Sequence, residues 1–503
     1  MYDVVIIGCG PVGALATNLL ARSGLSVLVL EKETALHPLP RAVHLDHEMV
    51  RLFQSAGVAP AILPDMVDTD GHLHVGSGHQ AIRYMGTVGH ARPFGWSNDW
   101  FFYQPELEAH LRAGFAGMAQ VDFRAGATFA DMAQDDAGVT VSFEQDGASH
   151  TARARWAIAC DGSRSPVRKA LGIALDDLQF EEPWLVVDAE VDGPISFPPI
   201  AGVPADADLQ RLSVMMCDPS RPATIVPGRG NHRRWEFMLL PGEDDAAMMA
   251  PERVAELVGP WVQGVPHTIV RAATYRFHGL VAERWQEGRV FLAGDAAHQT
   301  PPFFGQGMCH GLRDVANLAW KMAAIVNDGA DPAILATYQP ERDPHVRAVI
   351  GAAVAAGRYI CELDREKAAA RDAAMLERAR AATQGETAHD LIPPIGPGIV
   401  LAGTPGAGER FIQPVLADGR RMDDVLGGGW RLFAAGAVSA PAGIRAIDIA
   451  QLADGGAIAA WLATRGADAV LVRPDHIVFG TGPAALLGGE RARLLGLKLE
   501  NAA

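Results

Sequence analysis

Hydrophobic positions near the start of the chain form two short runs separated by a helical repeat. Val4–Ile7 is apolar throughout, and Val27–Leu30 is apolar throughout before the chain reaches Glu31. Between them, residues 13–23 place apolar side chains at helical spacing. Strands that are apolar on both faces are typical of a parallel sheet covered by helices. This segment therefore predicts a β-α-β unit.

Further along, the hydrophobic pattern changes twice. Alternating runs at 139–143 and 152–159 predict more sheet, and helices are expected over 47–55 and from Pro105, a residue tolerated in a first helical turn. Between about 180 and 280, alternating runs such as 184–187 and 234–238 predict an inserted, mostly antiparallel sheet. The pattern of an apolar strand followed by a helix, seen at the start of the chain, returns with a strand at 289–295 and a helix over 307–325.

These changes divide the chain into four parts. The expected parts are a nucleotide-binding domain of residues 1–178 and 281–350, an inserted sheet domain of 179–280, a helical segment and linker of 351–395, and a compact α/β domain of 396–503. Residues 365–385 are rich in Ala, Arg and Glu and predict a helix, and 392–398 is the linker. Residues 70–100 give no clear prediction.

Composition narrows the class of protein. The chain has 503 residues, which is longer than a single hydrophobic core usually supports. Its net charge of −16 argues against nucleic acid and anionic membrane surfaces as partners. Its five cysteines include no C-x-x-C pair, so neither a disulfide framework nor a zinc site is expected. Glycines and a proline interrupt the apolar stretch 4–21, which excludes it as a membrane span. A cytoplasmic protein is expected.

A dinucleotide fingerprint lies between the first two predicted strands. Gly8-Cys9-Gly10-Pro11-Val12-Gly13 matches G-x-G-x-x-G, in which glycines permit a tight turn and a close approach of the backbone to a pyrophosphate. The following helix offers free N–H groups and the positive end of its dipole. Glu31 comes 18 residues after Gly13, where a carboxylate can accept hydrogen bonds from ribose hydroxyls. The motif alone does not separate FAD from NAD.

Three further segments carry a family resemblance. They are Arg289–Pro302, Cys160–Arg168 and Gly305–Lys321. In this order they resemble the second FAD motif, the Asp-Gly motif and the helix under the flavin of flavoprotein aromatic hydroxylases of the p-hydroxybenzoate hydroxylase type, over residues 1–350. Within that family, Pro40–Asp46, Pro183–Asp188, Cys217–Pro222 and Arg233–Phe237 are most similar to the 3-(3-hydroxyphenyl)propionate hydroxylases.

The resemblance implies a Rossmann-like FAD domain, a bound FAD, and NADH or NADPH that binds transiently. It implies hydroxylation of a phenolic ring by O₂ through a C4a-hydroperoxyflavin, ortho or para to an existing hydroxyl, with no protein nucleophile. The residues that it implies for cofactor binding are Gly8, Gly10, Pro11, Gly13, Glu31, Lys32, Arg41, Gln104, Asp161, Gly162, Gly294, Asp295, Pro302, Gly305, Gly307, Met308 and Cys309. Where many relatives carry Asn, Cys309 offers no amide to the flavin.

Several side chains have two interpretations. The candidates for the substrate pocket are His44, Trp235, Phe237, Phe303 and Phe304, with Trp235 and Phe237 sharing one strand face that is either pocket or core. A structural hydrogen bond is favoured over catalysis for His298, and packing over reactivity for Cys309. An arginine that binds a substrate carboxylate is plausible. Its candidates are Arg211, Arg221, Arg233 and Arg234.

The last domain resembles the thioredoxin-like tail of this subgroup, and because it contains no cysteine, thiol–disulfide chemistry there is excluded. Packing or a contact within a homodimer is expected instead, and a chain ending near residue 395 that kept its oligomeric state and flavin would contradict this. Two alternatives to small phenols remain. One is a tailoring oxygenase of a larger aromatic or polyketide, and the other is a flavoprotein reductase that does not oxygenate.

Overall fold

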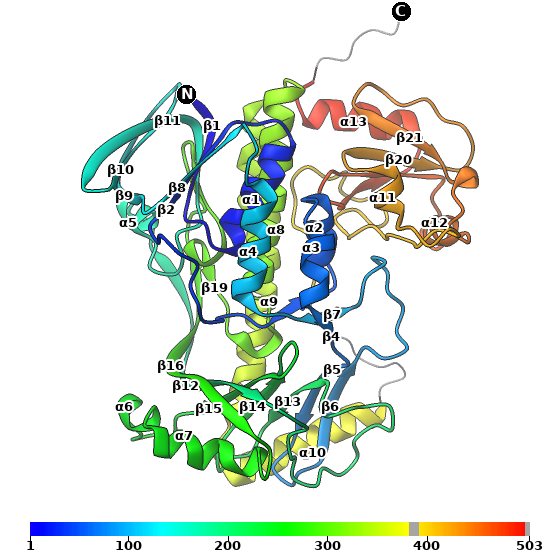
Figure 1. The fold of residues 1–503 in the computed structure, drawn as a ribbon. Helices are drawn as coiled ribbons and strands as arrows, with labels where there is room; N and C mark the ends of the chain where they lie inside the picture. Colours follow the sequence, from blue (N-terminus) through cyan, green and yellow to red (C-terminus); the bar gives the residue numbers. More distant parts are fainter. Residues whose placement is uncertain (382–391, 498–503) are drawn as a thin grey trace, which may run out of the picture.

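The computed structural model describes residues 1–381 and 392–497. Two sheets lie one above the other, and a smaller α/β domain packs beside the upper one (Figure 1). The expected helix over 365–385 is confirmed as α10 (Arg365–Ala381), while its last residues and part of the 351–395 segment lie outside the described residues. Within the described ranges, no helix is long and apolar enough to cross a bilayer.

The upper sheet confirms the predicted β-α-β unit. β1 lies between β2 and β11 and pairs in parallel with both, so that Ile7 opposes Leu30 on one side and Ala159 on the other. The strands of this sheet are β17 (Gln286–Glu287), β18 (Val290–Leu292), β11 (Ala148–Ala159), β1 (Tyr2–Ile7), β2 (Val27–Glu31) and β8 (Val121–Ala125), with β10 (Gly138–Gln145) and β9 (Thr128–Asp135) paired beside β11.

Helices cover this sheet and form the centre of the molecule. They are α1 (Pro11–Arg22), α4 (Gln104–Phe115), α5 (Pro166–Ala170), α8 (Gly307–Asn327) and α9 (Tyr338–Ile360). α1 packs against both α4 and α8. α8 is buried almost all round, which fits a helix enclosed by protein on every side.

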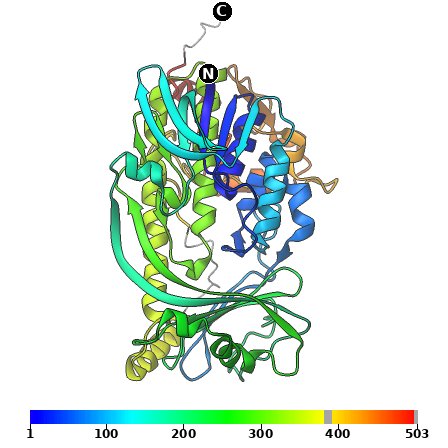
Figure 2. The ribbon, with the colours of Figure 1, turned by 60° about the vertical axis from the view of Figure 1, so that its left-hand side comes forward.

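The lower sheet confirms the inserted antiparallel domain, but three of its strands, β5, β6 and β19, come from outside the expected range. Its order is β19 (His298–Gln299), β16 (His267–Ala282), β12 (Leu175–Val191), β15 (His232–Met238), β14 (Ala223–Pro227), β13 (Leu212–Met216), β5 (Gly71–Val75) and β6 (Ala81–Gly86). The segment 71–86 was assigned to the nucleotide domain, yet β5 pairs in parallel with β13. The long strands β12 and β16 curve from beside the upper sheet into the lower one (Figure 2).

The lower sheet has a core of its own on the face away from the upper domain. α6 (Asp245–Met248) and α7 (Pro251–Val258) cover this face, with Val254 and Val258 packed into the core. α10 lies against β6, and the Asp372 carboxylate accepts hydrogen bonds from the backbone N–H and the hydroxyl of Ser77, both at 2.7 Å. The helical segment therefore belongs structurally to the inserted domain.

A small layer joins the two sheets. It consists of the strands β3 (His44–Asp46), β7 (Asp99–Phe101) and β4 (Val67–Asp68) and the helices α2 (Met49–Ser55) and α3 (Ala59–Ile62). β7 pairs antiparallel with β3, so that His44 opposes Phe101 and Asp46 opposes Asp99. Part of the segment 70–100, which the sequence left unassigned, thus forms strands.

The C-terminal domain confirms the expected thioredoxin-like α/β unit. Its sheet has the order β21 (Ile444–Asp448), β20 (Trp430–Ala434), β22 (Ala469–Val472) and β23 (Val478–Thr481), with helices α11 (Met422–Leu426), α12 (Ala457–Ala463) and α13 (Ala484–Leu494). One sheet face packs toward α8, where the Trp430 and Trp320 rings meet edge to face at 5.6 Å between centroids. The buried Arg473 guanidinium lies 2.9 Å from Glu341 on α9.

Candidate functional site

The turn between β1 and α1 leaves no room for side chains at two of its glycines. Gly8 has φ +95°, and a Cβ there would lie 2.4 Å from the Cys160 carbonyl oxygen. A Cβ at Gly13 would lie 2.0 Å from the Gly8 carbonyl oxygen. At Gly10, in contrast, a Cβ would meet no atom within 4 Å. Gly8 and Gly13 thus close the turn tightly, while Gly10 presents bare backbone at the helix N-terminus, where a pyrophosphate fits.

Glu31 ends β2 beside this turn. Its carboxylate accepts hydrogen bonds from the backbone N–H groups of Cys9, at 2.7 Å, and Glu33, at 2.9 Å. Each carboxylate oxygen retains capacity for another donor. The next residue, Lys32, has an exposed side chain 3.7 Å from Glu33, and neither Glu31 nor Lys32 lines the cavity described next.

A cavity of about 430 Å³ joins the glycine turn to the lower sheet. Its wall at the upper domain includes Gly10, Pro11, Arg41, Gln104, Gly162 and Asp295. Its wall before α8 includes Pro302, Phe303, Gly305, Gly307 and Met308. His44 and residues of seven strands of the lower sheet, β5, β12, β13, β14, β15, β16 and β19, line the rest of the cavity. Twelve of the residues predicted for the cofactor site or the substrate pocket therefore surround one space.

Gln104 and Asp161 fix the loops at the upper end of the cavity. The Gln104 side-chain oxygen accepts hydrogen bonds from the N–H groups of Arg41, at 2.9 Å, and Ala42, at 2.7 Å. The Asp161 carboxylate accepts a hydrogen bond from the Val167 N–H at 3.0 Å, and burial raises its pKa. Asp161 does not line the cavity, whereas the neighbouring Gly162 does.

Asp295 faces the cavity from the turn after β18. Burial raises the pKa of its carboxyl, while the charges of His298 and Arg41 act in the opposite direction. Gly294, just before it, has φ +61° and lies against Val12 of α1. This close approach holds the Asp295 turn against the helix that begins at the glycine motif.

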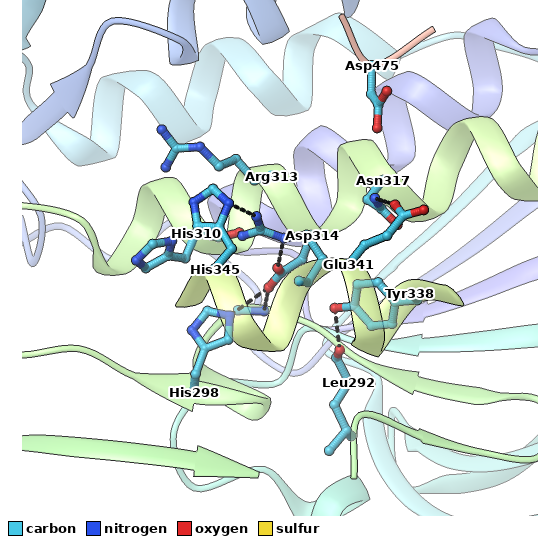
Figure 3. Close-up of polar contacts among 12 residues, drawn as sticks. Leu292, His298, His310, Arg313, Asp314, Asn317, Tyr338, Glu341, His345 and Asp475 are labelled. Atoms are coloured by element: carbon cyan, nitrogen blue, oxygen red, sulfur yellow. Dashed lines mark hydrogen bonds and ion pairs between the residues drawn. The ribbon is translucent and has the colours of Figure 1, made fainter. Parts of the chain in front are cut away.

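A buried polar network fastens the same turn to α8 and α9 (Figure 3). The Asp314 carboxylate accepts hydrogen bonds from the Gly294 N–H at 3.0 Å and from Arg342 Nε at 2.9 Å, and it lies 2.7 Å from His298 Nε2. Burial raises the pKa of Asp314, but the charges of His298 and Arg342 hold it below its usual value overall. His298 is buried in this network, which agrees with the structural interpretation. No pattern in the sequence identified Arg342 as a partner of Asp314.

His44 forms a buried pair with Asp99 in the cavity wall. Their Nε2 and Oδ1 atoms lie 3.1 Å apart. Burial lowers the pKa of His44, but the hydrogen bond and charge of Asp99 outweigh it and raise the pKa overall. With His72, the pair brings three potential metal-ligand atoms within 4.8 Å of one another. The direct contact between His44 and Asp99 already engages two of these atoms.

The lower sheet corrects two of the pocket candidates. Trp235 and Phe237 are buried in the core beneath the sheet, with Val254 and Val258 of α7, and do not line the cavity. Because neighbouring side chains of a strand point to opposite faces, Arg234 and Glu236 line the cavity instead. The shared face of the two aromatic rings was expected, and it is the core face.

Phe303 and Phe304 also lie in different places, since only Phe303 lines the cavity. Phe303 lines the cavity and packs against Trp184, at 5.9 Å between ring centroids, and Phe277, at 6.4 Å. Phe304 is buried away from the cavity, under the Arg83 guanidinium at 5.8 Å. Phe304 is therefore core, and its assignment to the pocket is wrong.

Cys309 is also buried away from the cavity. Its Sγ lies 3.7 Å from the Gly305 carbonyl oxygen, one turn earlier, and burial raises its pKa well above the ordinary value. A thiol in such surroundings is unreactive. Packing is the interpretation that the geometry favours, and Met308 occupies the cavity wall beside it.

The arginines proposed for a substrate carboxylate have other partners. Arg211 pairs with Asp68 and Asp70, Arg221 pairs with Glu243, and Arg234 pairs with Asp188. Neither Arg211, Arg221 nor Arg233 lines the cavity. Sequence reasoning missed the cavity residues Glu236, Arg271 and Tyr275, because alternation along a strand separates two faces without saying which one meets the cavity.

A tight glycine turn, open backbone at Gly10 and a cavity shared with an antiparallel sheet define a dinucleotide-binding protein whose cofactor site opens into a cavity above that sheet. Residues 1–353 match the family model described as FAD binding domain, so the chain belongs to this FAD-binding family. The expectations of this family, of bound FAD and of a flavin-dependent aromatic hydroxylase are confirmed.

The relatives are hydroxylases. A 3-(3-hydroxy-phenyl)propionate/3-hydroxycinnamic acid hydroxylase 2 of Burkholderia vietnamiensis is 37% identical, covering 84% of this chain and 78% of the relative. A probable NADH-specific resorcinol 4-hydroxylase of Rhodococcus jostii is 32% identical, covering 99% and 94%. The flavin-dependent monooxygenase PieE superimposes with a TM-score of 0.80 at 23% identity, covering 99% of each chain. Aklavinone-11 hydroxylase gives 0.77 at 25% identity, covering 98% and 99%.

Proposed function

We propose that this enzyme hydroxylates a phenolic ring ortho or para to an existing hydroxyl, using O₂ and either NADH or NADPH. Compounds like 3-(3-hydroxyphenyl)propionate are the first substrates to test. The observation that carries this proposal is the single cavity in which the glycine turn meets a chamber with aromatic walls. The cofactor ring and a small aromatic compound would share this space, which is what transfer between them requires.

The residues around the upper end fit FAD. The backbone at Gly10 and Pro11 would receive the pyrophosphate, because no Cβ fills the space there and the α1 N-terminus faces it. The Glu31 carboxylate would accept a hydrogen bond from a ribose hydroxyl, and the Asp295 carboxylate would accept one from a ribityl hydroxyl. Gly307 and Met308, at the α8 N-terminus, would bring a positive dipole end to the flavin ring. Bound FAD supplies the redox chemistry, accepting hydride and activating O₂.

The protein's own part is to bind, orient and exclude water. Phe303, Phe277 and Phe101 supply apolar wall, and Ser213 and Thr224 supply hydroxyl groups on the floor. His44, which is held by its contact with Asp99, presents its imidazole ring in the wall. A phenol held between such walls has its ring fixed by packing and its hydroxyl by hydrogen bonds.

The relatives support the two finer choices. The Rhodococcus relative is described as NADH-specific, which favours NADH, and the Burkholderia relative is described as acting on hydroxyphenylpropionate. The likeness to aklavinone-11 hydroxylase, at 25% identity, keeps a larger aromatic substrate as the second candidate.

The test is the oxidation of NADH and NADPH by the FAD-loaded protein, with and without a panel of meta-substituted phenols. Hydroxylated product and hydrogen peroxide are measured together. Strong stimulation with close to one product per nicotinamide oxidised is the expected result. Stimulation only by larger polycyclic phenols would favour the second candidate. Oxidation that is unaffected by every phenol would refute both and favour a reductase.

Assembly and location are inferred from the C-terminal domain and the cysteines. One face of the C-terminal domain is held against α8 and α9 by buried contacts. We infer that its remaining surface contacts a second copy of the chain in a homodimer. The five cysteines are unpaired, which favours a reducing, cytoplasmic compartment.

A further inference from the structure

Glu236 occupies the centre of the cavity floor. It lies on β15, opposite Val186 of β12 on one side and opposite Thr224 of β14 on the other. Thr224 is in turn opposite Met215 of β13. All four residues line the cavity. Directly opposed residues of antiparallel strands have Cβ atoms about 5 Å apart, so the Glu236 carboxyl is flanked by an apolar side chain and a hydroxyl.

The neighbouring charges are engaged elsewhere. Arg234 donates to both carboxylate oxygens of Asp188, at 2.8 and 3.1 Å. Arg271 donates to the Pro40 carbonyl oxygen and the Tyr275 hydroxyl. Within residues 1–381 and 392–497, no group forms a hydrogen bond with the Glu236 carboxyl. Its oxygens are therefore open to a molecule in the cavity.

The surroundings bring the pKa of this carboxyl close to neutral pH. Burial raises the pKa of Glu236 to about 7, with a contribution from the Asp188 charge, although Arg234 and Arg271 act in the opposite direction. A general base works best when its pKa is close to the working pH. Such a shifted carboxyl in a cavity is typical of functional sites.

We propose that Glu236 is a catalytic residue, which binds the phenolic hydroxyl of the substrate and takes its proton. The inference rests on the proposed function and adds the residue that activates the ring. The O–H bond of the phenol breaks, its proton moves to a Glu236 oxygen, and the electron pair stays on the phenol oxygen. The ring carbons ortho and para to that oxygen become more nucleophilic, as hydroxylation requires. No electron leaves the substrate in this step.

Other titratable or charged groups face the same cavity from the elements around it. They are Arg41 before β3, His44 at the start of β3, His72 from β5, Cys160 after β11, Arg234 from β15, Arg271, Tyr275, Arg276 and His278 from β16, and Asp295 from the turn after β18. A pH dependence must therefore be assigned by substitution. Glu182 provides the matched control, since it lies on β12 of the same sheet and burial also raises its pKa, but it does not line the cavity.

The test is a spectrophotometric titration of a nitrophenol bound to the FAD-loaded protein. A nitrophenol ionises near neutral pH and its phenolate absorbs visible light. If the ligand shares a proton with Glu236, two coupled groups titrate in two steps with a plateau of partial ionisation between them. The E236Q protein should show one step, and E182Q should keep two. A single step in the unsubstituted protein would overturn the proposal, whether or not E236Q folds.

Turnover of the best phenol in the panel gives a second readout. We expect kcat/KM of E236Q to fall by about 10²- to 10⁴-fold, the usual worth of a general base, and to lose its rise with pH near 7. E182Q should retain both the rate and the pH profile. If the unsubstituted protein hydroxylates phenols but E236Q keeps its rate and pH profile, only the role of Glu236 is refuted. If it hydroxylates no phenol, the proposed function falls and this inference falls with it.

Discussion

Replacing Arg473 by methionine is expected to weaken the attachment of the C-terminal domain to the FAD domain. The Arg473 guanidinium is fully buried, lies 2.9 Å from Glu341 and 2.6 Å from Asp475, and also donates to the Ile399 carbonyl oxygen at 3.1 Å. Methionine fills much of the same volume without the charge. The Glu341 carboxylate, which is also fully buried, then loses its strongest partner.

The magnitude follows from what remains around Glu341. Removing one partner of a buried ion pair usually costs about 3–5 kcal/mol, because the other charge stays buried. Lys321 stays 3.1 Å from Glu341, and Asn317 and the Ile399 N–H still donate to the carboxylate. We therefore expect a loss near the lower limit, about 3 kcal/mol.

The assay is urea unfolding of the FAD-loaded protein, followed by tryptophan fluorescence and by flavin release. Arg493→Met is the matched control, because Arg493 is in the same domain and pairs with Glu490 at an exposed site. That change should cost less than about 1 kcal/mol. A double-mutant cycle of R473M with E341Q should be strongly non-additive. Equal losses for R473M and R493M, or an additive cycle, would refute the reasoning.

Three further predictions follow from other sites. Gly10→Ala should fold normally but retain FAD at least about tenfold more weakly, since its methyl group would enter the pyrophosphate space, whereas Gly351→Ala, on an open helix surface, should leave FAD titrations unchanged. The Cys309 thiol should resist alkylation at neutral pH until urea is added, as measured by mass spectrometry, because burial raises its pKa. The pKa of Glu341 is lowered to about 2, below the unfolded value of about 4.3, so its stabilisation is present above pH 4.3 and is lost as pH falls toward 2. E341Q should flatten that part of the stability curve.

The parts of the site that the sequence predicted are those that short segments determine by themselves. The turn containing Gly8 and Gly13 needs glycine because backbone atoms lie within 2.4 Å of any added Cβ. That requirement leaves a pattern in six consecutive residues. The turns around Gly294 and Gly305 are similar, since both have positive φ. Local steric demands therefore explain why short motifs in the sequence identified several residues that line the upper wall of the cavity.

The floor of the cavity depends on contacts between distant segments, and there the sequence was insufficient. Alternation places Trp235 and Phe237 on one face, but it does not say which face meets the cavity. The cover provided by α7 on the opposite side decides this. The position of β5 in the lower sheet likewise depends on pairing with β13, about 140 residues later. Glu236 escaped notice because its importance arises only from this assembled floor.

α8 connects these separate observations. Its first residues, Gly307 and Met308, line the cavity, and its middle, at Asp314, holds the Gly294 turn (Figure 3). Further along, Trp320 packs on Trp430 of the C-terminal domain. Because a helix transmits position along its length, a domain that fixes the far end also fixes the N-terminus in the cavity wall. A cysteine-free thioredoxin-like domain can therefore serve the site through packing alone, without redox chemistry of its own.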